Sequence, residues 1–103
     1  MMGWFFPSST ETKKHRRFVS EPMGDKDVTE LPGIGEVLGG RLRDEGYCEA
    51  SQVLAQFLRL NKDKAAFQRW LKCVCDANCK QCEDCYRALC DYSNKYMVTN
   101  YSL

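Results

Sequence analysis

The sequence of 103 residues has few of the features that mark membrane, secreted or strongly charged proteins. No apolar run approaches the length of a membrane span, and the first ten residues lack the basic segment that opens a signal peptide. The formal net charge is only +1, so nucleic-acid binding would depend on local patches; the basic cluster at 13–17 is interpreted as the solvated start of a helix or a tail. We expect one small domain inside the cell, with reduced cysteines and no membrane insertion.

Regular alternation of apolar and polar residues, the pattern of a β-strand, is also missing. Apolar residues instead recur at helical spacing, which predicts an all-α fold, a compact bundle of about five or six short helices. The expected helices cover residues 13–20, two segments joined by a tight hairpin within 28–46, and then 49–60, about 66–74 and 81–93. We assign residues 1–12 to a flexible N-terminal arm, 13–93 to the helical domain and 94–103 to a C-terminal tail.

Cysteine, by contrast, is abundant, and five of the seven lie in CVCDANCKQCEDC at residues 73–85. A structural zinc site needs four converging ligands, usually as two pairs some distance apart. Here the C-x-x-C pairs overlap and the only histidine, His15, is far upstream, so we expect neither a metal nor a cofactor. Cys82, Cys85 and Cys90 fall on the apolar stripe of the last predicted helix, where cysteine behaves as a small hydrophobic residue. Core thiols are therefore favoured, with metal binding and redox sensing or crosslinking as the alternatives.

The stretch VTELPGIGEVLGGRL, residues 28–42, fits the helix-hairpin-helix pattern. The six matching positions are Val28, Leu31, Gly33, Ile34, Gly35 and Gly39. The glycines of the hairpin permit turn dihedrals that are closed to bulkier residues and let another backbone come near. The pattern predicts outward-facing backbone N–H groups at the start of a helix, where a phosphate can bind, with added charge from Arg41. Such contacts touch phosphate and sugar rather than bases, so we expect sequence-independent binding of double-stranded DNA.

Five segments in order closely resemble the barrier-to-autointegration factor family: KHRRFVSEPMGDKDV, GIGEVLG, VLAQFLRLNKD, FQRWLK and ANCKQCEDC. The likeness runs from about Thr10 to Tyr92 without evident insertions. Proteins of that family are small all-α homodimers in which each subunit carries one helix-hairpin-helix. The resemblance implies a nuclear protein, with some cytoplasmic pool, that bridges DNA duplexes and helps to organise chromatin and the nuclear envelope through LEM-domain proteins.

Matching positions extend the resemblance to individual residues. The implied DNA contacts are Lys14, Gly33, Gly35, Val37, Leu38, Arg41, Cys79 and Lys80. The implied dimer and partner face comprises Val53, Ala55, Gln56, Phe57, Leu58, Arg59, Leu60 and Trp70. The family's phosphorylated Ser/Thr cluster falls at Thr10 and Thr12, where a phosphate would repel DNA.

Some positions depart from the family pattern. Arg59 stands where an apolar residue is expected in the partner groove, which predicts weak or altered LEM-domain binding. Cys73, Cys79 and Cys82 stand where the family has no cysteine. Nothing in so short a chain supplies a catalytic domain, so no enzymatic activity is expected. An adaptor that dimerises with a related chain, and has lost or weakened DNA or LEM-domain binding, is the competing interpretation.

Overall fold

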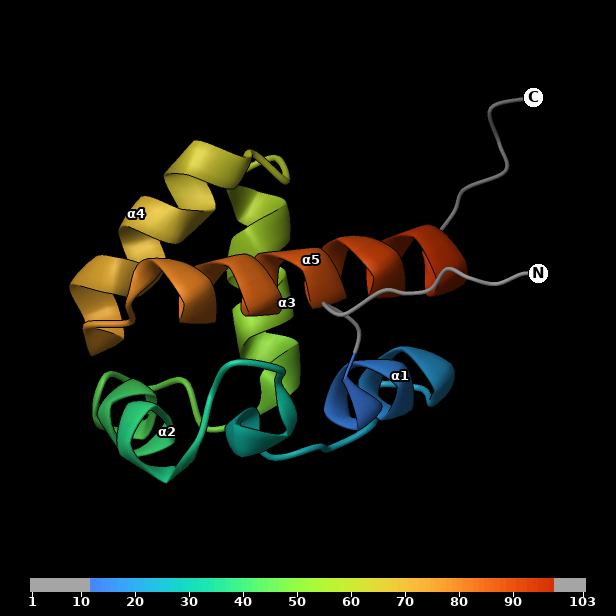
Figure 1. Cartoon of the computed structure of the whole chain (residues 1–103), viewed down its shortest axis with the longest axis horizontal. Helices are drawn as coiled ribbons and strands as arrows, with labels where there is room; N and C mark the ends of the chain where they lie inside the picture. The colour runs from blue at the N-terminus through green and yellow to red at the C-terminus, as the bar shows by residue number, and fades with distance from the viewer. Residues whose placement is uncertain (1–11, 98–103) are drawn as a thin grey trace, which may run out of the picture.

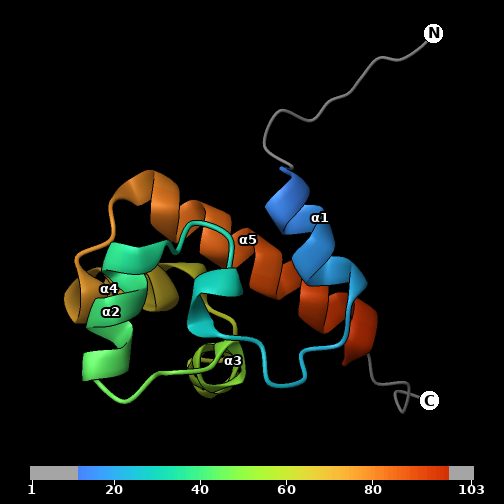
Figure 2. The ribbon, with the colours of Figure 1, turned by 90° about the horizontal axis from the view of Figure 1, so that it is seen from below.

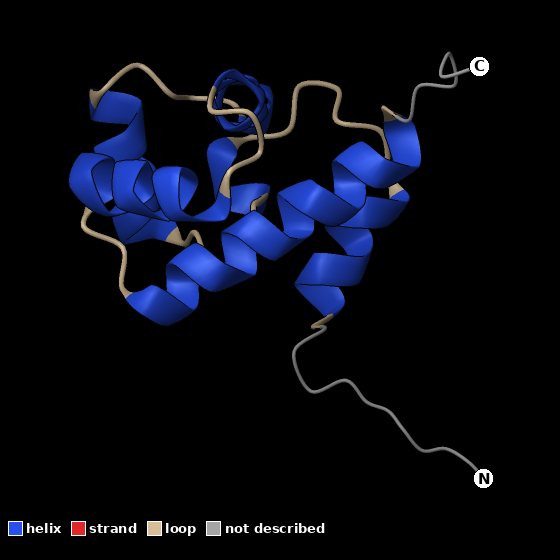
Figure 3. Cartoon of the chain, turned by 90° about the horizontal axis from the view of Figure 1, so that it is seen from above, coloured by secondary structure: helices blue, strands red, loops and turns tan. Residues whose placement is uncertain are grey.

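The computed structural model describes residues 12–97, and every regular element within them is a helix (Figures 1 and 3). The elements are α1 (Lys13–Ser20), the 3₁₀ turn η2 (Val28–Glu30), α2 (Glu36–Asp44), α3 (Ala50–Arg59), α4 (Lys64–Cys75) and α5 (Cys79–Tyr96). Asp27 and Glu49 meet in one isolated β-bridge, which ties the start of η2 to the start of α3. The predicted all-α fold with five or six short helices is confirmed over the described residues.

The helix ends follow from local chemistry. The Thr12 side chain accepts a hydrogen bond from the backbone N–H of His15 and begins α1, which ends at an extended Glu21 just before Pro22. The carboxylate of Asp63 begins α4 in the same manner, by accepting from the N–H of Ala66 at 2.8 Å. These side-chain caps satisfy N–H groups that have no partner within the helix, which is why the chain enters a helix at these positions.

Two predicted helix lengths were wrong. The last helix was expected over 81–93 and instead spans Cys79–Tyr96, because Asn78 and Gln81 form a reciprocal capping box that starts it two residues earlier. The first helix of the hairpin is only the single 3₁₀ turn η2, which Asp27 caps through the N–H of Thr29. Pro32 lies too close behind this turn for a longer helix to form.

Helix α5 crosses the molecule, with α4 beside its first half and α1 beside its second half (Figures 1 and 2). Helix α2 packs against α4 and η2, and α3 packs against η2. The core between these helices is apolar and aromatic, and the rings of Phe57 and Phe67 meet edge to face with centroids 5.6 Å apart. Cys82 and Cys85 are fully buried in it and Cys90 packs against it, so the predicted core position of these thiols is confirmed.

The basic cluster at 13–17 is not the uniformly solvated segment that its composition suggests. His15 is buried, and its Nε2 lies 2.8 Å from a carboxylate oxygen of Asp91 on α5. Phe18, also buried, packs its ring against that of Tyr92 with centroids 5.6 Å apart. Helix α1 is therefore an integral part of the bundle, and only its other face presents basic side chains to solvent.

Candidate nucleic-acid interface

The hairpin between η2 and α2 is pressed against the start of α5. Gly33 has a φ of +85°, in the region that favours glycine, and a Cβ added to it would lie 2.6 Å from the backbone carbonyl oxygen of Gln81. Ile34 between the two hairpin glycines is fully buried, as predicted. The hairpin loop therefore lies directly against the first turn of α5, and Figure 2 shows the two segments from below.

Helix α2 begins without a side-chain cap. Its N-cap residue is Gly35, which has no side chain to offer, and no side-chain cap hydrogen bond forms there among the described residues. Gly35, Glu36 and Val37 are all exposed, and nothing lies within 4 Å of a Cβ added to Gly35. The first N–H groups of α2 are thus open to solvent at the positive end of the helix, which is the predicted arrangement for binding an anion.

Lys14 brings a positive charge to this hairpin from the first helix. Its ammonium donates a 2.8 Å hydrogen bond to the carbonyl oxygen of Ile34, twenty residues away in the chain. Partial burial lowers the pKa of Lys14, against the opposing effect of the nearby carboxylate of Glu30. The family resemblance implies that Lys14 contacts DNA, and the structure places Lys14 beside the loop that contains Gly33 and Gly35.

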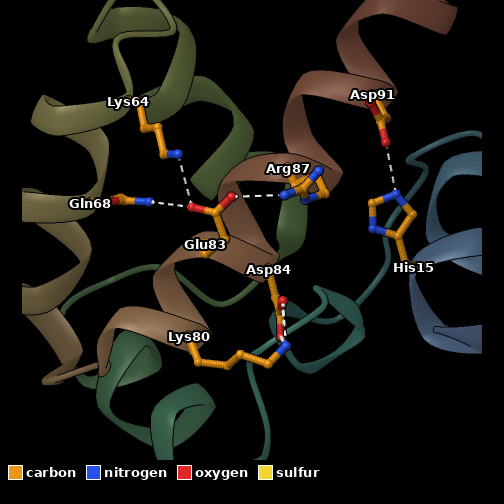
Figure 4. Close-up of polar contacts among 8 residues, drawn as sticks. All are labelled: His15, Lys64, Gln68, Lys80, Glu83, Asp84, Arg87 and Asp91. Atoms are coloured by element: carbon orange, nitrogen blue, oxygen red, sulfur yellow. Dashed lines mark hydrogen bonds and ion pairs between the residues drawn. The ribbon is translucent and has the colours of Figure 1, made fainter. Parts of the chain in front are cut away.

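Arg41 and Lys80 are exposed, and each has a partner within the chain. Arg41 donates to the carbonyl oxygen of Cys75 at 3.1 Å, at the negative end of α4. Lys80, on the first turn of α5, pairs with the carboxylate of Asp84 at 3.0 Å (Figure 4). Arg41 thus contacts the last turn of α4, and Lys80 lies in the first turn of α5. A bound phosphate would compete with Cys75 and Asp84 for these two cations.

Two acidic residues that sequence reasoning did not weigh lie at this surface. Glu36 is in the first turn of α2, and the Asp84 Cβ lies 3.3 Å from the position of a Cβ added to Gly33. Asp84 is three quarters buried at its side chain and partly neutralises Lys80. Lys80 and Asp84 lie four residues apart, the spacing of a helical ion pair, but the predicted helix began at residue 81 and so left Lys80 outside it.

Comparisons with known proteins agree on one family. The family model for barrier to autointegration factor matches residues 9–96. The barrier-to-autointegration factor of Drosophila melanogaster is 53% identical over 89 residues, covering 86% of this chain and 99% of the relative. The human protein of that name is 49% identical over 88 residues, which cover 85% of this chain and 99% of the relative. The chain belongs to the barrier-to-autointegration factor family.

The implied dimer and partner face lies mostly on α3, with Leu60 at its C-cap and Trp70 on α4, and the structure divides these residues into two groups by exposure. Val53 and Phe57 are fully buried in the chain's own core, so their side chains are not available at the surface for a partner to contact. The residues of this face that are exposed or half-buried are Ala55, Gln56, Leu58, Arg59, Leu60 and Trp70. Arg59 donates to the side chain of Gln56 at 2.9 Å, and this exposed set stays the predicted face.

Among the residues assigned to DNA contact, two are hydrophobic and differ sharply in exposure. Val37 is 66% exposed, whereas the side chain of Leu38 is buried, so only the backbone of Leu38 is available to a ligand. Thr12 is exposed and caps α1, while Thr10 lies outside the described residues. In residues 12–97, no helix is long and apolar enough to span a membrane, and no cluster of three or more His, Cys, Asp or Glu side chains is placed to hold a metal ion.

Proposed function

We propose that this chain binds double-stranded DNA through the open start of α2. The observation that carries the proposal is the uncapped helix end at Gly35, exposed and flanked by the Lys14 ammonium at the hairpin. A phosphate bound there would accept hydrogen bonds from backbone N–H groups and lie at the positive end of the helix. The start of α5, with Lys80, supplies a second contact to the same DNA backbone.

Binding of this kind is independent of sequence. Backbone N–H groups and lysine ammonium groups recognise phosphate oxygens, which are the same at every step of a duplex. Residues 33–40, the hairpin loop and the first turn of α2, contain no Arg, Lys, Asn or Gln, the side chains that most often make specific contacts to base edges. The protein therefore holds DNA at any sequence, and its affinity depends on charge.

Bridging of two duplexes requires two chains, because one chain contributes one hairpin. A two-fold homodimer, or a dimer with a related chain, through the exposed residues of α3 places a hairpin on each subunit. We propose that such a dimer acts in the nucleus, in chromatin organisation and nuclear envelope assembly with LEM-domain proteins, and is also present in the cytoplasm. Phosphorylation of Thr10 or Thr12 would add negative charge a few residues before Lys14 in the sequence, where it would repel DNA and weaken binding.

One observation favours the competing role of an adaptor with weakened DNA binding. Arg41 and Lys80 already have partners inside the chain, the Cys75 carbonyl and the Asp84 carboxylate. A phosphate must displace or share these partners, which reduces what each cation contributes. In this role the chain would dimerise with a relative that supplies the stronger DNA site.

The test is a binding titration with random-sequence duplexes at a series of salt concentrations, using the full chain. For roughly four neutralised phosphates the slope of log affinity against log salt is about −3 to −4. Equal affinity for unrelated sequences with a slope in that range supports the main proposal. Undetectable binding by the chain alone, restored in a mixture with a related family member, supports the adaptor, and a strong preference for one sequence contradicts both.

A further inference from the structure

The side chains of two cysteines at the start of α5 line a pocket, and the phosphate contact implied for Cys79 gives no role to that pocket or to Cys82. The pocket has a volume of about 200 Å³ and lies between α4 and α5, lined by Gln68, Arg69, Lys72, Cys79 and Cys82. It holds two thiols and two basic side chains. The pair belongs to one C-x-x-C segment, in which Cys79 is the first helical residue and Cys82 lies one turn later.

The two thiols of this pocket differ in exposure and in surroundings. Cys79 is exposed, and the ammonium of Lys72 lies 3.9 Å from its sulfur. Cys82 is buried, its thiol faces the carbonyl oxygen of Gln68 at 3.6 Å, and this burial raises the pKa of Cys82. The Lys72 ammonium places positive charge beside the exposed sulfur of Cys79, whereas the buried thiol of Cys82 lies against backbone carbonyl groups and is less accessible to a reagent. This asymmetry makes Cys79 the sulfur that attacks and Cys82 the sulfur that reacts second.

The two cysteines lie one helical turn apart at the start of α5. Residues three apart on a helix lie about 5–6 Å from each other at Cβ, whereas the two Cβ atoms of a disulfide lie about 3.5–4.5 Å apart, so a bond requires the first turn of α5 to close by roughly 1–2 Å. Residues of the first turn have N–H groups with no partner inside the helix, so Cys79 can shift slightly without breaking the bonds of later turns. A disulfide between Cys79 and Cys82 therefore requires a backbone shift confined to the first turn of α5.

We propose that Cys79 and Cys82 form a thiol–disulfide exchange site for low-molecular-weight disulfides that carry carboxylates, such as glutathione disulfide. The Cys79 thiolate attacks one sulfur of glutathione disulfide, so a Cys79–glutathione disulfide forms and one glutathione thiolate leaves. Cys82 then attacks the sulfur of Cys79, the second glutathione leaves, and the Cys82 proton passes to a glutathione thiolate. The products are the Cys79–Cys82 disulfide and two reduced glutathiones, so two thiols are oxidised and one disulfide is reduced.

The basic side chains define which disulfides the site prefers. Arg69 and Lys72 line the same pocket as the reacting sulfur atoms and place positive charge beside the attacking thiolate. Glutathione carries carboxylates, and these interact favourably with both cations while the mixed disulfide exists. An uncharged disulfide such as hydroxyethyl disulfide lacks this interaction. The exchange reaction is a property of the α4–α5 pocket and does not depend on whether the chain binds DNA.

The experiment treats the reduced full chain with glutathione disulfide under native conditions, stops the reaction by rapid alkylation, and maps the cysteines by mass spectrometry. The expected product is a disulfide between Cys79 and Cys82, with Cys48 and Cys73, the other exposed cysteines, modified several-fold more slowly. In C82S the mixed disulfide at Cys79 accumulates because the second step is lost. In C79S both products are lost, and C73S, at an exposed cysteine that does not line this pocket, serves as the matched control and reacts like wild type.

Two further measurements keep the proposal testable if C82S does not fold. The wild-type chain alone must show faster alkylation at Cys79 than at Cys48 and Cys73, and K72M must slow the reaction with glutathione disulfide several-fold more than that with hydroxyethyl disulfide. Circular dichroism checks that each variant is folded. Equal reactivity of all three exposed cysteines, or a disulfide that joins any other pair, overturns the proposal.

Discussion

Gly33 lies directly against Gln81, because a methyl group on the Gly33 Cα would be 2.6 Å from the Gln81 carbonyl oxygen. Gly33 thus joins the hairpin to the first turn of α5, and its role is packing as much as conformation. Gly35, two residues later, has open space around it and an ordinary φ of −105°. Gly33 therefore holds together the two segments that are proposed to bind phosphate, and Gly35 leaves the start of α2 open.

Replacement of Gly33 by alanine is expected to destabilise the fold by about 2–4 kcal/mol, the sum of backbone strain at positive φ and steric overlap with a backbone carbonyl. Chemical denaturation followed by circular dichroism measures the loss. G24A is the matched control, because Gly24 has a φ of +50° but nothing within 4 Å of an added Cβ. Equal losses in the two variants would show that the contact with Gln81 contributes nothing.

Replacement of Gly35 by aspartate is expected to separate stability from DNA binding. Aspartate is a favourable N-cap residue, so the folded state keeps its stability or gains roughly a few tenths of a kcal/mol. The carboxylate occupies the N–H groups and repels phosphate, so duplex affinity falls about tenfold or more. G35A adds a methyl group in open space, leaves the N–H groups free and should bind DNA like wild type. An undiminished affinity in G35D would place the phosphate site elsewhere.

A charge at Ala55 is expected to prevent dimerisation. Ala55 is exposed on α3, beside the half-buried Leu58, and burial of a glutamate there without a partner is unfavourable. A55E should therefore be a monomer that binds single duplexes weakly and no longer bridges two of them. Light scattering measures the mass, with A65E, at an exposed alanine of α4, as the control that keeps the dimer. A monomeric wild-type chain that still bridges duplexes would contradict this architecture.

Replacement of Arg59 by valine is expected to strengthen binding of a LEM domain. Arg59 is exposed between the half-buried Leu58 and Leu60, so an apolar partner would have to cover its charge. A calorimetric titration should give a higher affinity for R59V than for wild type, with R17V on α1 unchanged. Tight binding by the wild-type chain, reduced in R59V, would show that the partner uses the arginine.

The buried thiol of Cys75 is expected to make the fold sensitive to alkaline pH. Burial raises the pKa of Cys75 to about 11, so the unfolded chain loses this proton at lower pH than the folded chain. The stabilisation is complete below the ordinary thiol value and is lost as pH rises from there to about 11, by about 2–3 kcal/mol in total. Denaturation across this range should show a shallower decline for C75A than for wild type, whereas C48A, at an exposed cysteine, should decline like wild type.

Local signals in the sequence were sufficient to predict most helices. Apolar spacing and Pro22 set α1 at 13–20, where the structure has it, because both act within a few residues of the chain. The same signals place the start of α5 two residues too late. Gln81, the predicted first residue, lies inside the helix, where its side chain accepts a hydrogen bond from the backbone N–H of Asn78. The sequence also predicted the hairpin from its six matched positions, because a turn of that shape requires glycine at defined places.

The sequence by itself determined the helical class, the hairpin and the family, since periodicity, glycine placement and similarity are properties of the residues in order. Only the tertiary structure decided which side chains are available. It buries His15, Val53 and Phe57, and it gives Arg41 and Lys80 partners at Cys75 and Asp84. It also places Lys72, from α4, beside Cys79 of α5. Exposure and pairing depend on which helices meet across the core, and contacts between segments distant in sequence form only when the chain is folded.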